Sequence, residues 1–209
     1  MERSLLPLNV VVLPNKSVSN TAIQLGEILS KNKLPVQFVL DPKQMKPHIT
    51  LYQSPFPVDN FSEIESAVSK IANETNPIEL HLKRISVEFV TFIFWAVENN
   101  EKLSTLHKEV LLKLNPLREG HISPHLQSVP LEGVDAKDVE KYGIPLVLER
   151  YWPHMTLGRI VNASDATKVL ELLGRETKNT FTVNKISICE LGDHGTVGKT
   201  LAEFKLKYK

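Results

Sequence analysis

KPHITLYQ (residues 46–53) and YWPHMTLGRI (residues 151–160) carry the same phrase, Pro-His-apolar-Thr-Leu. A lone His-x-Ser/Thr triplet is a weak signal, and the chain contains two more, at residues 121–123 and 194–196. The repeated phrase is more specific, because both copies have proline before the histidine and leucine after the threonine. Both copies also fall at matching positions in two similar halves of the chain. The prediction is therefore a duplicated site.

Each phrase is typical of a short β-strand that begins after a proline. Successive side chains of a strand point to opposite faces. His48 and Thr50 therefore share one face of the first strand, and His154 and Thr156 share one face of the second. The aliphatic residues between them face the other way, toward helices. Each strand is expected to present an imidazole beside a hydroxyl.

Two such strands, packed as a pseudo-twofold pair, would bring two imidazoles and two hydroxyls to one groove. Imidazole titrates near pH 6.5, so one ring can take a proton while the other donates one. Threonine hydroxyls can donate hydrogen bonds to anionic oxygens. These groups suit cleavage of a phosphodiester by general acid–base catalysis, without a metal ion.

The composition is that of an ordinary globular protein, with 42% hydrophobic and 23% charged residues. The net charge of +1 is too balanced for gripping long duplex nucleic acid, but a nucleotide or RNA terminus needs only a local site. Cys189 is the only cysteine, which excludes an internal disulfide and favours a reducing compartment. The apolar run at residues 5–14 is too short to cross a membrane. We expect a soluble, cytoplasmic monomer.

Hydrophobic periodicity predicts an α+β protein whose two halves repeat the order helix, Pro-His-apolar-Thr strand, helix, hairpin. We expect one domain over residues 1–209, with structural halves at 1–90 and 91–209. The expected helices cover residues 19–32, 60–75, 102–114 and 165–174, and the expected strands lie at 8–13, 47–52, 78–98 and 181–207. Residues 115–149 are rich in proline and glycine and are expected to be irregular, apart from a short helix near 135–142. Either a lid or a surface excursion would fit this segment.

The two phrases resemble the paired His-x-Thr motifs of the 2H phosphoesterase superfamily, the LigT-like or 2′-5′ RNA ligase group. The likeness in element order covers nearly the whole chain, whereas the likeness in residues is confined to the motifs and their neighbours. It implies a bilobal, pseudo-twofold fold with two antiparallel sheets lining a central cleft and helices outside. It also implies hydrolysis of 2′,3′-cyclic or related cyclic phosphates of nucleotides or RNA termini, with no cofactor. His48, Thr50, His154 and Thr156 carry over as the catalytic residues.

Under this resemblance one histidine deprotonates water, the other protonates the departing ribose oxygen, and the threonines hold the phosphoryl oxygens. The pseudo-symmetry leaves base and acid unassigned. The first motif continues with Tyr-Gln-Ser, where bacterial members named for RNA ligation often have Phe-Leu-Gly, which weakens any claim to their particular substrate. Two alternatives stay open. One is a nucleotide- or RNA-end-binding module without turnover, and the other is 2′-5′ end joining, for which no nucleotidyl-accepting lysine motif is present.

Three neighbours of the motifs are candidates for substrate binding. Tyr52 and Trp152 lie on the predicted groove face and could stack a base, or could fill the rim of the core. Arg159 matches a common continuation of the second motif. Strand alternation points Arg159 away from His154 unless Gly158 marks a bulge, so a phosphate contact and a surface ion pair both stay open.

Two other patterns are set aside. Gly-Lys-Thr at residues 198–200 has the wrong spacing from Gly192 for a P-loop and precedes an alternating strand instead of a helix. His121 and His125 stand four residues apart, but Pro124 argues against a regular helix between them. No cysteine or carboxylate cluster adjoins them, so no metal site is expected.

Overall fold

The computed structural model describes residues 4–41, 45–98, 100–127, 131–174 and 177–207. Within them the strands are β1 (Leu5–Val12), β2 (Val36–Val39), β3 (Ile49–Pro57), β4 (Ile78–Glu88), β5 (Phe92–Val97), β6 (His154–Ile160), β7 (Asn179–Val183), β8 (Lys185–Leu191) and β9 (Val197–Lys205). The helices are α1 (Lys16–Lys31), α2 (Phe61–Glu74), α3 (Glu101–Leu114), α4 (Pro124–Gln127), α5 (Gly133–Tyr142) and α6 (Ala166–Leu173). The α+β class expected from the sequence is confirmed.

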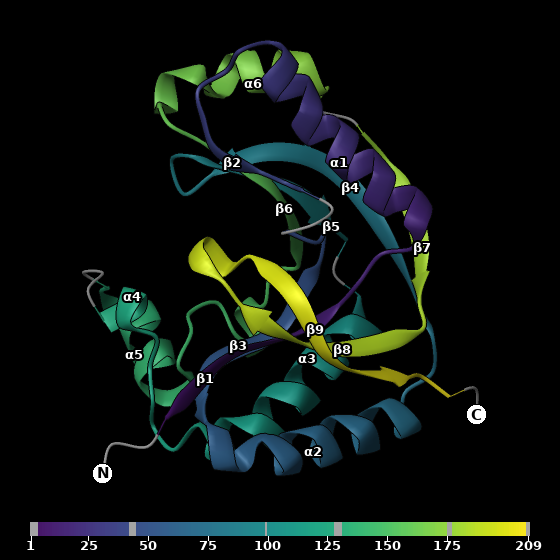
Figure 1. Ribbon diagram of the computed structural model, residues 1–209, viewed down its shortest axis with the longest axis vertical. Coiled ribbons are helices and arrows are strands. Elements are labelled where there is room, and N and C mark those ends of the chain that lie inside the picture. The colour runs from purple at the N-terminus through teal and green to yellow at the C-terminus, as the bar shows by residue number, and fades with distance from the viewer. Residues whose placement is uncertain (1–3, 42–44, 99, 128–130, 175–176, 208–209) are drawn as a thin grey trace.

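The strands form one antiparallel sheet in the order β7-β4-β5-β6-β3-β1-β8-β9, with β2 paired to β6. The expectation of two sheets was wrong, because β3 and β6 pair at Ile49 and Met155 and so join the two sets of strands. Figure 1 shows how strongly this single sheet curls. The two strands that carry the motifs therefore meet at its centre.

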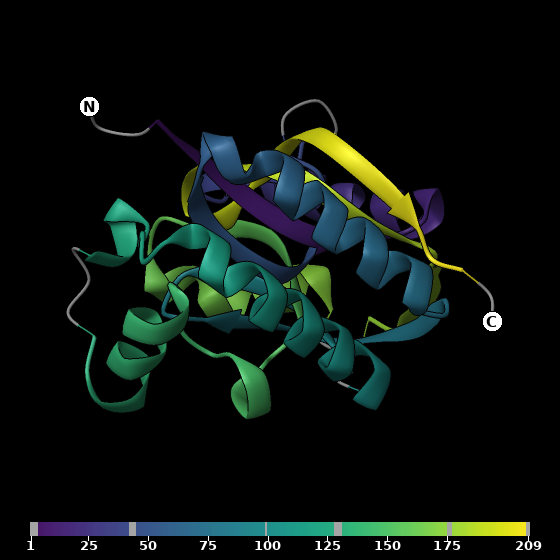
Figure 2. The same cartoon turned by 90° about the horizontal axis from the view of Figure 1, so that it is seen from below.

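We name the two sides of this junction the first-motif arm (β3, β1, β8 and β9) and the second-motif arm (β6, β5, β4 and β7, with β2). Helices α1 and α6 cover the second-motif arm, and α2 and α3 cover the first-motif arm (Figure 1). Figure 2 shows α2 and α3 side by side. The helices thus lie on the outside of the curled sheet.

The strand order is the same from either end if β1 is exchanged with β5, β3 with β6, β8 with β4 and β9 with β7. Each arm nevertheless draws on both parts of the chain. β4 comes from residues 1–90 but lies in the second-motif arm, and β8 and β9 come from residues 91–209 but lie in the first-motif arm. The pseudo-twofold relation is therefore built with exchanged strands.

The first motif strand contains a β-bulge just after its threonine. The register of β3 against β1 slips between Thr50 and Tyr52, which leaves Leu51 as the extra residue. A bulge interrupts the alternation of side chains. Leu51 and Tyr52 are both fully buried, and Gln53 shares a hydrogen-bond partner with Thr50 on the opposite face.

The second motif strand has the same irregularity at the same place. The register of β6 against β5 slips between Thr156 and Gly158, at Leu157. Leu157 is fully buried and Gly158 is buried, whereas Arg159 is only half-buried. The two motif strands therefore match in their bulges as well as in their sequences.

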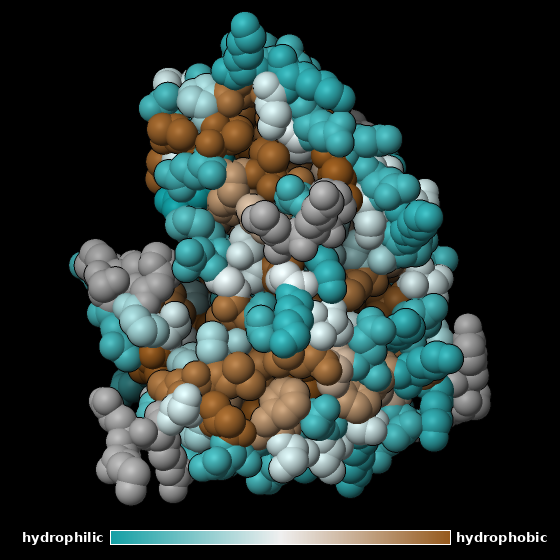
Figure 3. Space-filling model, viewed as in Figure 1, coloured by the Kyte–Doolittle hydropathy of each residue, from teal (hydrophilic) through white to brown (hydrophobic). Residues whose placement is uncertain are grey.

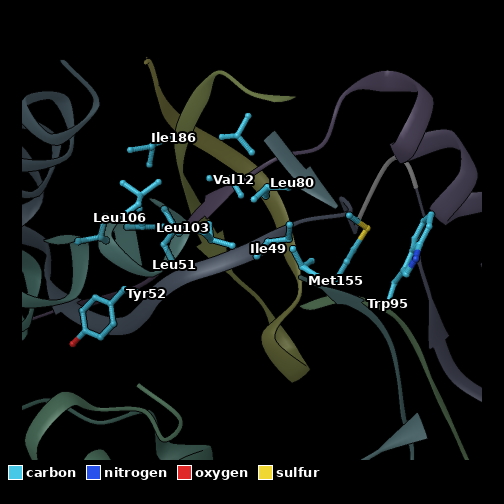
Figure 4. Close-up of a cluster of buried hydrophobic side chains, with 14 of the residues drawn as sticks. Val12, Ile49, Leu51, Tyr52, Leu80, Trp95, Leu103, Leu106, Met155 and Ile186 are labelled. Atoms are coloured by element: carbon cyan, nitrogen blue, oxygen red, sulfur yellow. The ribbon is translucent and has the colours of Figure 1, made fainter. Parts of the chain in front are cut away.

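The core lies between the sheet and its helices. Ile49 and Met155 are fully buried and lie close together where β3 and β6 meet (Figure 4). Tyr52 points away from this pair in Figure 4. The spacing of buried residues in α1 follows the helical period, and Asn15 caps the helix by accepting a hydrogen bond from the Val18 amide at 2.9 Å.

Residues 115–149 are anchored within the described part of the chain. The Arg118 side chain is buried and donates hydrogen bonds to the carbonyls of His121 (2.9 Å) and Glu140 (3.0 Å). The hydroxyl of Tyr52 donates to the Tyr142 carbonyl at 2.7 Å. The predicted short helix is present as α5. The segment thus packs against the Tyr52 side of β3, which favours a surface excursion over a lid.

Polar residues dominate the α1 side of the face in Figure 3, and an apolar band crosses its lower half. Within the described residues, every helix is too short or too polar to cross a bilayer.

Candidate active site

The pairing of Ile49 with Met155 sets the register of the two motifs. In an antiparallel ladder, a step back on one strand is a step forward on the other. His48 therefore lies across from Thr156, and Thr50 lies across from His154. The four motif residues come together in two matched pairs, each with one imidazole and one hydroxyl.

Two of the four motif residues line a pocket between the two arms. His48 and Thr156 both line it. Its other walls come from β2 on one side and from residues 45–46 and the β8–β9 turn on the other. A larger pocket, between the C-terminal end of α2 and the N-terminal end of α3, contains none of the motif residues. The site therefore opens where the arms face each other.

Both imidazoles are held by the same backbone contact. Nδ1 of His48 lies 2.9 Å from the carbonyl oxygen of Lys46, and Nδ1 of His154 lies 2.9 Å from that of Trp152. A carbonyl can only accept, so Nδ1 carries the proton in each ring. This leaves Nε2 with its lone pair in the neutral ring. Each histidine can accept a proton at Nε2 or, once charged, donate one there.

Burial and mutual repulsion favour neutral rings. Desolvation lowers the pKa of His48, against smaller opposing effects of the Lys46 and Gly195 carbonyls. The pKa of His154 is lowered to about 4, chiefly by desolvation, with the positive charge of His48 adding to the effect and the Trp152 carbonyl opposing it. The two rings are thus close enough to repel each other when charged. A bound anion would offset both the desolvation and the repulsion.

Thr50 belongs to a polar group that the sequence analysis missed. The Asn9 side chain, fully buried in β1, donates from Nδ2 to Oγ1 of Thr50 at 3.1 Å and to Oε1 of Gln53 at 3.2 Å. Because the hydroxyl oxygen of Thr50 accepts this bond, its own proton is free to point elsewhere. Oδ1 of Asn9 is buried and has no hydrogen-bond partner among the described residues. An asparagine within the apolar strand LLPLNVVV was the signal that could have found it.

Arg159 lies on the motif side of β6, because the bulge at Leu157 reverses the alternation. Its Nε donates to Oγ1 of Thr91 at 2.9 Å, and its guanidinium lies 4.6 Å from the centre of the Phe92 ring. Its Nη1 lies 3.3 Å from Nδ1 of His194, whose residue lines the pocket. Arg159 thus contacts the pocket wall through His194 but does not line the pocket itself.

The two aromatic candidates have different positions. Tyr52 was expected on the groove face, and this was wrong, because the bulge turns its ring into the core, where it is fully buried. Trp152 is half-buried, and its ring centre lies 5.2 Å from that of His154 and 5.6 Å from that of Phe94. Of the two, only Trp152 lies beside a motif histidine with part of its surface open.

A buried histidine supports the first motif from behind. Nδ1 of His107, in α3, donates to the carbonyl of Leu51 at 2.7 Å, and Nε2 accepts from the amide of Leu148 at 3.0 Å. The ring of Tyr151 stacks on His107 with centres 3.9 Å apart, and its hydroxyl donates to the carbonyl of Thr50 at 2.8 Å. The bulge of β3 is therefore held by two side chains from outside the strand.

Metal ligation has little support in the described part of the chain. Among these residues, no three His, Cys, Asp or Glu side chains group closely enough to hold a metal ion. The side chain of His125 lies outside the described residues, so the argument against a His121–His125 site stays a prediction. Residues 198–200 were expected in the hairpin turn before the last strand, but β9 already begins at Val197, so they lie within the strand. A strand at this place does not fit the loop and helix of a P-loop.

Comparison with solved structures identifies the fold as LigT-like. The structure of TT0787 from Thermus thermophilus matches with a TM-score of 0.63 at 15% identity, covering 96% of this chain and 97% of that one. E. coli LigT in its apo form matches with a TM-score of 0.61 at 12% identity, covering 98% and 99%. E. coli LigT complexed with 3′-AMP matches with a TM-score of 0.54 at 13% identity, covering 99% and 100%.

The family follows from the sequence itself. The model of the 2′-5′ RNA ligase superfamily matches residues 40–195, which include both motifs, so this chain belongs to that superfamily of LigT-like 2H phosphoesterases. The resemblance noted from the two phrases is confirmed. No curated protein sequence matches the chain.

Proposed function

We propose that this protein is a metal-independent phosphodiesterase that hydrolyses 2′,3′-cyclic phosphates of nucleotides or RNA termini. One observation carries the proposal: two histidines, each held through Nδ1 by a backbone carbonyl, lie across the β3–β6 junction from each other's threonines. Two acid–base groups and two hydroxyl donors around one opening suit a reaction in which a proton is removed on one side of a phosphate and delivered on the other.

The reaction needs one neutral and one protonated imidazole. Nε2 of the neutral ring takes a proton from water, and the water oxygen forms a bond to phosphorus. The bond from phosphorus to one ribose oxygen breaks, and Nε2 of the protonated ring gives its proton to that oxygen. The product is a ribose phosphomonoester, and one water molecule is consumed. Each positioned proton transfer contributes roughly 10²–10⁴-fold to the rate.

The threonines and Arg159 would act on the phosphate charge. The hydroxyl proton of Thr50 is free to reach a phosphoryl oxygen, because Asn9 already donates to its oxygen. Thr156 has the matching position across from His48. Arg159 lies next to His194 at the pocket wall, where a small side-chain movement would bring its guanidinium to an anion. Charge-assisted hydrogen bonds of this kind are the stronger ones.

Nucleotides are the favoured substrate class. Structures of E. coli LigT have been solved with phosphate, 3′-AMP, ATP and NADP+. All these ligands are phosphates, and three of them carry a nucleoside. The near-neutral net charge of this chain also suits a local phosphate site better than long nucleic acid.

The test is turnover of 2′,3′-cyclic nucleotides and of short RNAs ending in a cyclic phosphate, in the presence of a chelator. His48→Ala and His154→Ala should each lower kcat by about 100-fold or more. Phosphorus NMR of the product would show whether the 2′ or the 3′ bond breaks. Equal turnover by wild type and both variants would contradict the proposed pair. Tight nucleotide binding without turnover by the wild type would favour the binding-module alternative.

A further inference from the structure

The tip of the β4–β5 hairpin is unusual in what it exposes. Phe89 and Val90 are 60% and 72% exposed, the highest values among the exposed large hydrophobic side chains of the described residues. Both also have a left-handed backbone, with φ of 45° and 72°. That conformation strains a side chain with a Cβ, and a β-branched valine most of all. Turns of this kind usually carry glycine, asparagine or aspartate. Strained backbone of this sort concentrates at functional sites.

A continuous set of aromatic rings leads from this tip to the second motif. The Phe89 ring lies 6.1 Å from that of Phe94 and 6.4 Å from that of Trp152, in edge-to-face arrangements of 70° and 66°. The Phe94 ring in turn stacks on His154, with centres 4.0 Å apart. One ring therefore separates exposed Phe89 from a motif imidazole. We call Phe89, Phe94 and Trp152 the aromatic wall.

In the described residues of β1 that face the first motif, the corresponding positions are not aromatic. Phe94 pairs with Thr156 in the second motif, and Val11 pairs with Thr50 in the first, so Val11 occupies the position equivalent to Phe94. In the same way, Phe92 pairs with Arg159 and Asn9 pairs with Gln53, so Asn9 occupies the position equivalent to Phe92. The two catalytic halves are alike at the histidine and threonine but differ in what surrounds them. A substrate that is itself asymmetric, with a phosphate at one end and a flat apolar group at the other, would use this difference.

We propose that the aromatic wall is the binding site for the nucleobase attached to the reacting ribose phosphate, with Phe89 as its outer stacking surface. This rests on the proposed function, because it places the base of the substrate that the motif residues would cleave. Base stacking on an aromatic side chain changes affinity by about 5- to 150-fold per base and tolerates any base, since every base has a π face. Purines should bind better than pyrimidines, because they cover more of the ring.

A protein partner is a poorer fit to this surface. A stable protein interface involves about 800 Å² on each side, contributed by roughly 20–30 residues. The exposed apolar group here is confined to two adjacent side chains at a hairpin tip. A single flat ring system matches this size.

The experiment compares three substrates: 2′,3′-cyclic AMP, 2′,3′-cyclic CMP and methyl riboside 2,3-cyclic phosphate, which has no base. Wild type should show the lowest KM for the purine and the highest for the base-free compound. Phe89→Ala should raise KM for cyclic AMP by about 5-fold or more and leave KM for the base-free compound unchanged. Phe89→Tyr, which keeps the ring, should behave like wild type. Leu112→Ala removes a 49% exposed side chain from α3 and serves as the matched control.

The outcomes separate the two proposals. If wild type turns over cyclic phosphates but Phe89→Ala leaves the preference for a base intact, or raises KM for all three substrates alike, the aromatic wall is not the base site. If wild type turns over none of the three substrates, the proposed function fails, and a nucleotide-binding measurement then tests whether the aromatic wall binds a base. Adenosine 2′- and 3′-monophosphates should then quench the fluorescence of Trp152, and Phe89→Ala should weaken that titration at least about 5-fold. Trp95 is fully buried and serves as the unquenched internal reference, and absence of quenching in wild type would overturn the proposal.

Discussion

Replacing His107 with phenylalanine tests whether the first motif is held from behind. The phenyl ring has nearly the shape of imidazole and can keep the stack on Tyr151, but it can neither donate to the Leu51 carbonyl nor accept from the Leu148 amide. The variant therefore removes two hydrogen bonds and little packing. His107 is 1% exposed, so water cannot replace either bond at the ring.

The expected cost follows from the two groups left without a partner. A buried donor or acceptor that loses its partner costs about 1–3 kcal/mol. Leu51 is fully buried, whereas Leu148 is half-buried, so its amide should cost the smaller amount. We expect His107→Phe to lower the free energy of unfolding by about 2–4 kcal/mol. With a urea m-value of about 2–3 kcal/mol/M, the unfolding midpoint should fall by about 1 M.

The cost should depend on pH. Burial lowers the pKa of His107, and the Leu51 carbonyl only partly opposes this. A depressed pKa in the folded state means that the neutral ring stabilises the fold above the unfolded pKa of about 6.5, and that this contribution is lost as the pH falls through the folded value. The difference in stability between wild type and His107→Phe should therefore be larger at pH 8 than at pH 5.

Urea titrations of both proteins at pH 8 and pH 5 make the measurement. Tyr151→Phe is the matched control, because it keeps the stack and removes the hydroxyl that donates to the Thr50 carbonyl. It should cost about 1 kcal/mol with no change between the two pH values. If the proposed activity is present, His107→Phe should also lower kcat/KM of the folded protein by about tenfold or more, because Thr50 is displaced. A cost below about 1 kcal/mol, or an equal cost at both pH values, would refute this reasoning.

Two further predictions concern the motif strands. If activity is found, kcat/KM should reach its maximum below about pH 6.5 and should fall about tenfold per pH unit above the pKa of the acid. The reason is that burial lowers the pKa of both His48 and His154 in the free protein. A maximum above about pH 7.5 would contradict this. Gly158→Ala should destabilise the fold by about 1–3 kcal/mol, since its Cβ would lie 2.7 Å from the backbone oxygen of Phe38. Thermal unfolding of this variant and of the control Gly26→Ala checks the prediction. The Cβ added at Gly26 would meet the Val39 side chain, at 3.1 Å, and it lies within a helix, which favours alanine. An equal loss of stability in the two variants would argue against the backbone clash at Gly158.

Much of the local structure could be predicted from the sequence. The strong helical periods at residues 60–75 and 102–114 correspond to α2, which is one residue shorter at each end, and to α3, which begins one residue earlier. The meeting of the two motifs could be expected from their repetition. These features depend on side chains near in sequence, where hydrophobic period and proline placement are informative.

The bulges could not be predicted in the same way. Nothing in the letters ITLYQ marks Leu51 as an extra residue, because a bulge depends on the partner strand and on what packs behind it. Simple alternation therefore put Tyr52 on the wrong face. It also turned Arg159 away, although the need for a bulge near Gly158 was recognised and one is present at Leu157. Asn9 was missed for a related reason, since its partners Thr50 and Gln53 lie far away in the sequence.

The exchange of strands between the arms has a consequence for synthesis. A ribosome releases β1 and β3 early, but their arm also needs β8 and β9, which lie in the last part of the sequence. The second edge of β3 must therefore wait for β6, which ends at Ile160, and the second edge of β1 must wait for β8, which ends at Leu191. Pairings between such distant segments form slowly, and exposed strand edges in the meantime favour aggregation. Chaperone demand during translation should thus be higher for this topology than for one made of two consecutive halves.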